Sequence, residues 1–401
     1  MRIGIDVSRT QAPVLTGTER YTYEVVHRLP ALHPEIQWRL FSDRPFHSRW
    51  SSQLKNIEYR VLPSRIGTAW SHTRLGPELR RHPVDLMFYP GTAIPLSARG
   101  PIVTTIHDLV FLTHPHLYAE KTTNNWKRRA IEVIGKAITL GRYSGGERAY
   151  QLWAYHQAMK CATRIISVSS ATHNSIKSLT PEHPPLITIP LGIDTPQNTD
   201  HDQQLGGNNT DPYFVFIGRL ERKKNLDRLL EAYNVYCTTN ANPWPLVLIG
   251  QPGFGWPEIE HRHKTLLTSN HVRLLGGVGD QERESILSRA SALFLVSEAE
   301  GFGLPAFEAA IRHVPVIASP VGAIPEYFQD AYIKIDPRDI ASMTAAMSKM
   351  TQHPDSVGSM TTIAFERIRG MTWDICAEKT AEVLLGTPLK SKDGNGIIRP
   401  L

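Results

Sequence analysis

The sequence predicts an α/β protein with two domains, each built around a parallel β-sheet. Two short apolar runs, at residues 292–296 and 314–319, flank a helical stretch that opens with Pro305. Apolar runs this short, without polar alternation, are typical of strands buried on both faces of a parallel sheet, and proline is favoured at the first position of a helix. The chain has 401 residues, 41% of them hydrophobic, which exceeds one typical core, so we expect two domains.

A polar segment marks the expected domain boundary. Residues 201–212 contain a Gly-Gly pair and an Asn-Asn pair, and such clusters are typical of loops and linkers. The last residues of the chain are also polar and contain glycines. The expected order is a first domain (1–195), a linker (196–212), a second domain (213–370), a helix (371–387) and a flexible tail (388–401).

The other elements follow from short apolar runs, which predict strands, and from helical spacing of apolar residues. In the first half, strands are expected at 2–7, 37–41, 58–62, 84–89, 101–110, 164–169 and 186–190, and helices at 19–29 and 170–178. In the second half, further strands are expected at 213–218, 246–250, 272–275 and 332–335, and helices at 225–236, 282–290, 340–350, 357–369 and 373–385.

Residues 119–162 are predicted to be helical, with a break at 141–146. The part from 121 to 148 is rich in Lys and Arg. The interpretation that we favour is an ordinary amphipathic helix packed on the first sheet. The alternative is a helix that lies on an anionic membrane surface or shapes the acceptor site.

The stretch 297–310, S-E-A-E-G-F-G-L-P-A-F-E-A-A, carries the chemistry around which the chain is arranged. It follows a buried strand, so its loop lies at the carboxyl end of a parallel sheet, where open α/β sheets bind ligands. Gly301 and Gly303 have no Cβ and let an anion approach closely. We expect the backbone amides of Phe302, Gly303 and Leu304 to lie at a helix N-terminus, and the positive end of the helix dipole there favours a negatively charged ligand. We expect a cradle for a diphosphate here.

Two carboxylates, Glu300 and Glu308, flank this cradle with seven residues between them. Because carboxylates repel phosphate and only accept hydrogen bonds, they suit hydroxyl donors on a sugar or a ribose. The alternative is a glycine-bearing turn with two solvated glutamates. The spacing around Gly-Phe-Gly favours the binding site.

Two cationic residues follow the strand expected at 213–218. Arg219 is the next residue after this strand, and Lys224 lies five residues further on, before the next helix. Cations beside a diphosphate neutralise charge on the leaving group. The alternative is a solvated surface, which we expect for the neighbouring Arg222 and Lys223.

The first domain offers two candidates. Gly17 lies in a polar loop after the first strand, where a strand–loop–helix unit can present amides to a phosphate; no G-x-G-x-x-G fingerprint is present. The apolar strand expected within residues 101–110 ends in His107 and Asp108. A single histidine is usually structural, and apart from Asp108 no obvious catalytic base stands at a strand end.

Composition excludes several classes of protein. The three cysteines form no close pair, which argues against a disulfide framework or a zinc site and fits a reducing cytosol. The first residues read as a strand and not as a signal peptide, and no apolar run approaches the roughly 20 residues of a membrane-spanning helix. The one Asp-x-Asp, at 200 and 202, falls in the linker, so we expect no catalytic metal. A net charge of +6 is compatible with an anionic partner or a merely solvated surface.

The 297–310 stretch resembles the E-x7-E motif of family-4 retaining glycosyltransferases, which have the GT-B fold: two Rossmann-like domains that face each other across a cleft. The resemblance covers the second half well and the first half more loosely, since relatives carry a Gly-Gly pair where this chain has Thr16-Gly17-Thr18. It implies that the last helix crosses back to the first domain. The implied donor contacts are Glu300 and His107 to the sugar, Glu308 to the ribose, Arg219 and Lys224 to the phosphates, Val278 near the base, and Gly17 at the cleft.

By this resemblance the protein is a retaining glycosyltransferase that moves a hexose from a nucleotide sugar to a glycan or lipid-linked acceptor, with no cofactor besides the donor. The leaving phosphate is thought to assist deprotonation of the acceptor hydroxyl. The overall character of the first half of the sequence favours GDP-mannose as the donor, and UDP-sugars and dTDP-sugars are the alternatives. A cytoplasmic protein, with peripheral contact at the inner membrane face as an option, is expected. The alternatives are a GT-B sugar-nucleotide epimerase or hydrolase and, less favoured, a basic nucleic-acid-binding protein.

Overall fold

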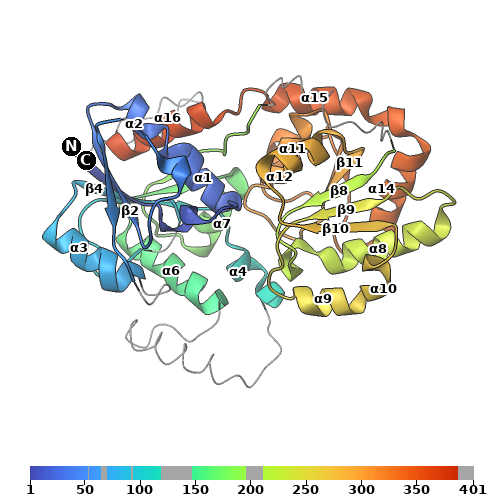
Figure 1. The fold of residues 1–401 in the computed structure, drawn as a ribbon, viewed down its shortest axis with the longest axis horizontal. Helices are drawn as coiled ribbons and strands as arrows, with labels where there is room; N and C mark the ends of the chain where they lie inside the picture. Colours follow the sequence, from blue (N-terminus) through green and yellow to red (C-terminus); the bar gives the residue numbers. More distant parts are fainter. Residues whose placement is uncertain (53, 65–69, 92–93, 119–146, 196–210, 387–401) are drawn as a thin grey trace, which may run out of the picture. The chain divides into compact units, whose positions relative to one another are not determined.

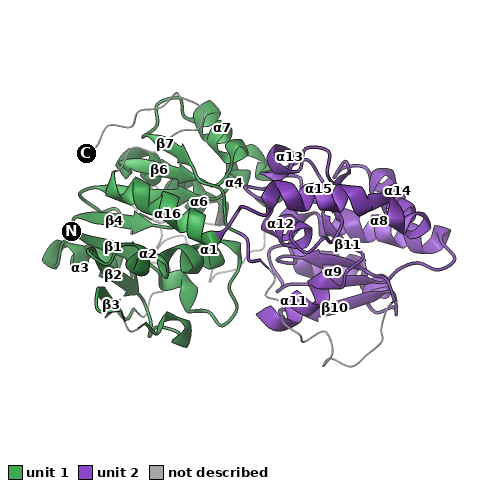
Figure 2. Cartoon of the chain, turned by 90° about the horizontal axis from the view of Figure 1, so that it is seen from above, with its two compact units in different colours: residues 1–192, 373–401 green, residues 193–372 purple. Residues whose placement is uncertain are grey.

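A computed structural model describes residues 1–52, 54–64, 70–91, 94–118, 147–195 and 211–386 (Figure 1). The chain divides into two compact units: unit 1 contains Met1–Gly192 and Trp373–Leu401, and unit 2 contains Ile193–Thr372 (Figure 2). Each unit contains one sheet, and every strand pair within the described residues is parallel. The residues of the predicted linker up to 210, and those of the basic segment up to 146, lie outside the described part.

The sheet of unit 1 has seven strands in the order β3-β2-β1-β4-β5-β6-β7. The order reverses between β1 and β4, and the carboxyl ends of strands at such a reversal form the usual ligand-binding crevice of an open α/β sheet. The strands are β1 (Arg2–Asp6), β2 (Gln37–Ser42), β3 (Ile57–Val61), β4 (Leu86–Tyr89), β5 (Ile102–Ile106), β6 (Arg164–Ser167) and β7 (Leu186–Thr188).

Several short helices of unit 1 were not anticipated by the sequence analysis, among them the π-helical turn η4 and the helix α3 that follows it. The described helices of unit 1 are η1 (Ser8–Gln11), α1 (Gly17–Val26), α2 (Leu29–Leu32), η2 (Ser48–Trp50), η4 (Ser71–Leu75), α3 (Gly76–Arg81), α4 (Val110–Thr113), η5 (Pro115–Tyr118), α6 (Glu147–Cys161), α7 (Ser170–Leu179) and α16 (Trp373–Leu385).

The C-terminal helix α16 packs with α1 inside unit 1, and two arginines hold it there. Arg28 Nε donates to Asp374 Oδ1 at 2.6 Å. The buried Arg164 donates from Nη1 to the Val383 carbonyl at 2.8 Å. The last helix therefore belongs to the same compact unit as the N-terminal strands.

The sheet of unit 2 has six strands in the order β10-β9-β8-β11-β12-β13 and reverses between β8 and β11. Its strands are short, and β8, β9 and β11 are apolar and buried at every residue. The strands are β8 (Phe214–Ile217), β9 (Leu246–Ile249), β10 (Val272–Gly276), β11 (Ala292–Leu295), β12 (Val316–Ala318) and β13 (Ile333–Lys334).

Helices on both faces complete unit 2, as Figure 1 shows. Phe214, Phe294 and Tyr236 from β8, β11 and α8 meet in its core, with Phe214 and Phe294 in an edge-to-face contact at 5.3 Å. The described helices are η7 (Arg222–Lys224), α8 (Leu226–Thr239), α9 (Trp256–Arg262), α10 (Lys264–Leu267), α11 (Asp280–Ser288), α12 (Leu304–Ala310), α13 (Ile324–Tyr327), α14 (Ile340–Gln352), η8 (Pro354–Val357) and α15 (Gly358–Ile368).

A membrane-spanning helix was not expected from the sequence. Among the described residues, none of the helices combines the length and the apolar character needed to cross a bilayer.

Candidate functional site

The loop between β11 and α12 lies at the carboxyl edge of the unit 2 sheet, beside the reversal of strand order. Helix α12 begins at Leu304, so Pro305 stands at the second helical position and not at the first as the sequence predicted. Gly303 precedes the helix with φ 94°, a conformation that favours glycine. Phe302 is buried and stacks on Phe307, with ring centroids 4.4 Å apart. The Phe302 side chain thus anchors the loop in the core.

The turn at Gly322 contacts the loop between β11 and α12. The Ala323 amide donates to the Phe302 carbonyl at 3.0 Å. Gly322 has φ 60°, and a Cβ at this position would lie 2.8 Å from the Phe302 carbonyl oxygen and 3.2 Å from Glu300 Cβ. The turn can approach the loop this closely because it carries a glycine.

Gly322→Ala is therefore expected to destabilise the protein by about 1–3 kcal/mol, because it combines a left-handed backbone with a steric clash. It should also displace the loop that carries Glu300. Gly358→Ala is the matched control: no atom lies within 4 Å of a Cβ there, and the residue is the first of helix α15. Denaturant unfolding of both variants measures the difference, and equal stability of the two would contradict the steric role of Gly322.

Lys224 and Glu300 meet at the point where strand order reverses. Lys224 ends η7, which follows β8, and Glu300 lies in the loop that follows β11. Lys224 Nζ donates to Glu300 Oε1 at 2.5 Å, and Ser297 Oγ donates to the same oxygen at 2.6 Å. Both charged side chains are mostly buried, with exposed fractions of 22% for Lys224 and 12% for Glu300. The structure thus brings together one predicted phosphate-binding cation and one predicted sugar-binding carboxylate.

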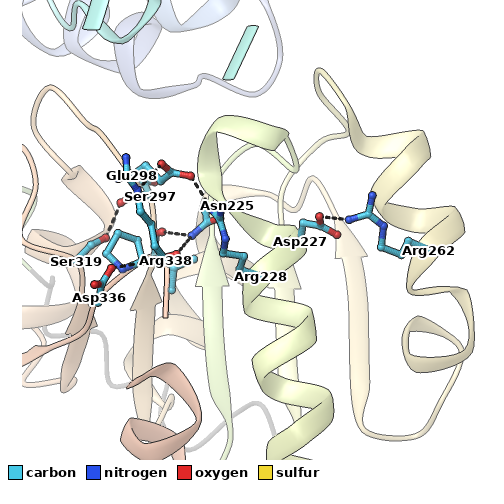
Figure 3. A network of polar contacts seen from close by, with 11 residues as sticks. Asn225, Asp227, Arg228, Arg262, Ser297, Glu298, Ser319, Asp336 and Arg338 are labelled. Carbon is cyan, nitrogen blue, oxygen red and sulfur yellow. Dashed lines mark hydrogen bonds and ion pairs between the residues drawn. The ribbon is translucent and has the colours of Figure 1, made fainter. Parts of the chain in front are cut away.

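A second group of ion pairs, missed by the sequence analysis, involves Glu298, two residues before Glu300 (Figure 3). Arg228, in the first turn of α8, donates from Nη1 to Glu298 Oε1 at 2.6 Å, and Arg338 Nε donates to Glu298 Oε2 at 3.2 Å. Burial by itself raises the pKa of Glu298, but the hydrogen bonds and charges of both arginines outweigh it and hold the pKa below its ordinary value. Glu298 is thus ionised at neutral pH and ties α8 to the loop after β11.

Asn225 explains why Lys224 faces this loop. Asn225 has φ 59°, which turns the chain between η7 and α8. Its Nδ2 donates to the carbonyls of Val296 at 2.9 Å and Pro337 at 2.6 Å. Ser319 Oγ also donates to the Ser297 carbonyl at 2.6 Å (Figure 3). These bonds fix the ends of β11 and β12 and the start of α8 with respect to one another.

Arg219 and Val278 lie on two loops at the same edge of the sheet, after β8 and after β10. Arg219 is exposed directly after β8, and among the described residues it forms no ion pair. Its side chain lies against Gly253 of the loop after β9, where a Cβ would come within 3.0 Å of Arg219 Cγ. Val278 is half-buried in the loop between β10 and α11. Both are therefore on the sheet edge that carries Lys224 and Glu300.

Glu308 lies in α12 and pairs with an arginine that the sequence analysis did not single out. Arg283 of α11 donates from Nη1 to Glu308 Oε2 at 2.7 Å and from Nη2 to Oε1 at 3.1 Å. Burial by itself lowers the pKa of Arg283, but the charge and hydrogen bonds of Glu308 outweigh it and hold the pKa above its ordinary value. The two glutamates of the motif are thus each held by a different cation.

The two remaining predicted residues belong to unit 1. His107 follows β5, and its Nε2 lies 2.8 Å from the Pro90 carbonyl; since a carbonyl only accepts, Nε2 carries the hydrogen. Burial lowers the pKa of His107, against the opposing effects of the Pro90 carbonyl and Asp108, so the ring is neutral at pH 7. Gly17 is the first residue of α1, where a Cβ would meet no described atom within 4 Å.

Asp6 is another acidic residue that the sequence analysis did not single out. It ends β1 at the reversal of the unit 1 sheet and accepts from the Ser8 amide at 3.0 Å and the Ser8 hydroxyl at 2.7 Å. Burial is the largest influence on its pKa, which lies above its ordinary value in spite of the Ser8 hydrogen bonds. An aspartate at the end of an apolar strand was the available signal.

Metal-binding and disulfide chemistry find no support in the described residues. No group of three or more His, Cys, Asp or Glu side chains within the described ranges is placed to hold a metal ion. The Asp-x-Asp at 200 and 202 lies outside those ranges. Cys161, Cys237 and Cys376 form no disulfide.

Comparison with known proteins identifies the family. The model of glycosyl transferases group 1 matches residues 197–367, and that of glycosyltransferase family 4 matches residues 15–197. Together the two models extend over both units. The chain therefore belongs to the family-4 glycosyltransferases of the GT-B fold, and it is a glycosyltransferase.

Individual relatives are similar over nearly the whole chain. The O-antigen chain mannosyltransferase B of Escherichia coli is 25% identical over 395 residues, which cover 91% of this chain and 95% of the relative. WaaG, a glycosyltransferase involved in lipopolysaccharide biosynthesis, has a TM-score of 0.70 at 15% identity, covering 96% of this chain and 100% of WaaG. HepE of Anabaena in complex with UDP-glucose has a TM-score of 0.66 at 16% identity, covering 96% and 99%.

Proposed function

We propose that this protein is a retaining, metal-independent hexosyltransferase that moves mannose from GDP-mannose to a glycan or lipid-linked acceptor in polysaccharide biosynthesis. The choice of mannose rests on the similarity to the Escherichia coli O-antigen chain mannosyltransferase B. The use of a nucleotide sugar is supported by HepE, whose structure contains UDP-glucose. We further propose a cytoplasmic location with peripheral contact at the inner membrane face.

The observation that carries this proposal is the Lys224–Glu300 pair at the strand reversal of unit 2. Lys224 and the exposed Arg219 are proposed to neutralise the donor diphosphate, which the amides of residues 302–304 cradle at the start of α12. Glu300 is proposed to face the sugar and Glu308 the ribose. A cation and a carboxylate within hydrogen-bond distance fit a ligand in which phosphate and sugar hydroxyls are neighbours.

The proposed chemistry is a front-side displacement. The bond between the anomeric carbon and the leaving phosphate oxygen breaks, and the acceptor oxygen bonds to that carbon on the same face. The acceptor proton passes to the leaving phosphate oxygen. In unit 1, the Nε2–H tautomer of His107 makes Nδ1 the acceptor nitrogen, which suits a hydroxyl of the donor sugar. Gly17 and Val278 are proposed to lie beside the donor, Val278 near the base.

Incubation of the purified protein with radiolabelled GDP-mannose, with and without a candidate acceptor glycan, tests the proposal. We expect label on the glycan, with the anomeric configuration of the donor retained in the product by NMR. UDP-glucose is assayed in parallel. Inversion of configuration would refute the retaining mechanism, and equal release of mannose with and without acceptor would identify a hydrolase.

Activity is expected to survive EDTA, because the cationic side chains Lys224 and Arg219, together with helix-terminal amides, take the place that a metal has beside a diphosphate. The measurement compares initial rates before and after chelation and dialysis. Complete loss of activity that magnesium restores would contradict metal independence.

A further inference from the structure

Two arginines connect helices α11 and α12 in opposite directions. Arg283 of α11 forms the bidentate pair with Glu308 of α12, at 2.7 and 3.1 Å. Arg312, just after α12, pairs in return with Glu284 of α11 through Nε and through Nη2, the latter 2.5 Å from Oε2. Each of the two segments thus supplies one glutamate to an arginine of the other, and this reciprocal pairing holds α11 and the end of α12 together.

The two arginines contact Glu308 in different ways. Arg283 holds the carboxylate, whereas Arg312 Nη1 donates to the backbone carbonyl of Glu308 at 2.7 Å. All three side chains are largely buried, with exposed fractions of 18% for Arg283, 5% for Glu308 and 6% for Arg312. Arg283 therefore determines where the carboxylate points, while Arg312 anchors the helix that carries it.

Arg283 also lies next to the loop that precedes α11. Its amide donates to the Gly279 carbonyl at 2.9 Å, and Gly279 closes the loop that contains Val278. An ionised carboxylate has about four lone-pair positions that accept hydrogen bonds. A bidentate arginine occupies one of them on each oxygen, so the carboxylate can accept further hydrogen bonds. A guanidinium fork also fixes the plane of the carboxylate, which a lysine ammonium does not.

We propose that Arg283 is a positioning residue for nucleotide recognition: its guanidinium orients the Glu308 carboxylate toward the ribose hydroxyls. The inference rests on the proposed function, in which Glu308 accepts from the ribose. Arg283 acts through Glu308 and has no contact of its own with the reacting atoms. The preference for ribose over 2′,3′-dideoxyribose is accordingly the property that depends on Arg283.

The test measures the dissociation constants of GDP and 2′,3′-dideoxy-GDP by calorimetry, with UDP and 2′,3′-dideoxy-UDP in parallel, using the base that binds more tightly. For the unaltered protein we expect the ribonucleotide to bind roughly tenfold or more tightly than the dideoxynucleotide, as for hydrogen bonds to a charged group. Arg283→Lys keeps the charge but not the fork. In this variant we expect the ratio of the dissociation constants, dideoxynucleotide over ribonucleotide, to fall to about three or less, mainly because the ribonucleotide binds more weakly.

Arg312→Lys is the matched control, because it alters the other half of the reciprocal pairing without removing a bond to the Glu308 carboxylate. Its ratio is expected to equal that of the unaltered protein, and thermal unfolding shows whether either variant has lost its fold. A ratio that Arg283→Lys leaves unchanged, or equal weakening of both nucleotides, overturns the positioning role. A ratio near one in the unaltered protein overturns the proposed ribose contact itself, and with it this inference.

Discussion

Glu300→Gln is expected to lower kcat and kcat/KM together, by on the order of a hundredfold or more. In the proposed mechanism Glu300 faces the sugar, where positive character develops as the bond to phosphate breaks, so its charge acts mainly in the transition state. Glutamine has nearly the same volume and keeps an oxygen for the Ser297 hydroxyl, which lies 2.6 Å from Glu300 Oε1. Steady-state kinetics with varied donor, together with a thermal-unfolding control, measure the effect.

Glu308→Gln is the matched variant from the other end of the motif. Its hydrogen bonds to the ribose change little as the glycosidic bond breaks, so we expect a donor KM raised about tenfold with kcat nearly intact, the pattern of lost uniform binding. If instead Glu308→Gln abolishes kcat and Glu300→Gln is mild, the two roles are exchanged. If neither variant affects the kinetics, the proposal that this loop binds the donor is wrong.

The parallel-sheet architecture was predictable because buried strands carry a local signal. The runs that form β8, β9 and β11 are apolar throughout, and the structure buries them at every residue. Short helices such as α3, α9 and α10 were not predicted, because four to seven residues carry too little periodicity to be recognised. Helix α1 begins at Gly17, two residues before the prediction. There the Glu19 carboxylate accepts from the Thr16 amide at 2.8 Å and the Thr16 hydroxyl at 2.7 Å.

The candidate site was predictable where its residues lie on one motif and not where partners come from distant segments. The positions of Glu300 and Glu308 follow from the loop and helix that carry them. The pairing of each glutamate with its cation was not predictable, although Lys224 itself was a candidate: Lys224 is 76 residues from Glu300, and Arg283 is 25 residues from Glu308. Such pairs depend on strand order, which places β8 beside β11 in the sheet. A single sequence contains no local signal for that order, so Arg283 was not singled out. Glu298 lies within the motif, but the partners that mark it, Arg228 and Arg338, come from other segments.

Lys224→Ala is expected to weaken binding of a nucleoside diphosphate on the order of a hundredfold and to leave binding of the corresponding nucleoside nearly unchanged. Lys224 is proposed to bind the diphosphate, which the nucleoside lacks, so the loss should depend on the phosphates. The variant also removes the cation 2.5 Å from Glu300, and this structural change should affect both ligands alike. The comparison between the two ligands separates these effects.

The neighbouring lysine provides the control for Lys224. Lys223 belongs to the same η7 turn and lies 3.5 Å from Glu221, away from the Glu300 pair. Lys223→Ala removes the same charge from the same turn, and we expect it to change diphosphate affinity by less than about threefold, as for a partly exposed ion pair. Calorimetric titration of GDP, UDP and their nucleosides into both variants gives the result. Equal losses for diphosphate and nucleoside in Lys224→Ala, or equal losses in the two variants, would mean that Lys224 does not bind the diphosphate specifically.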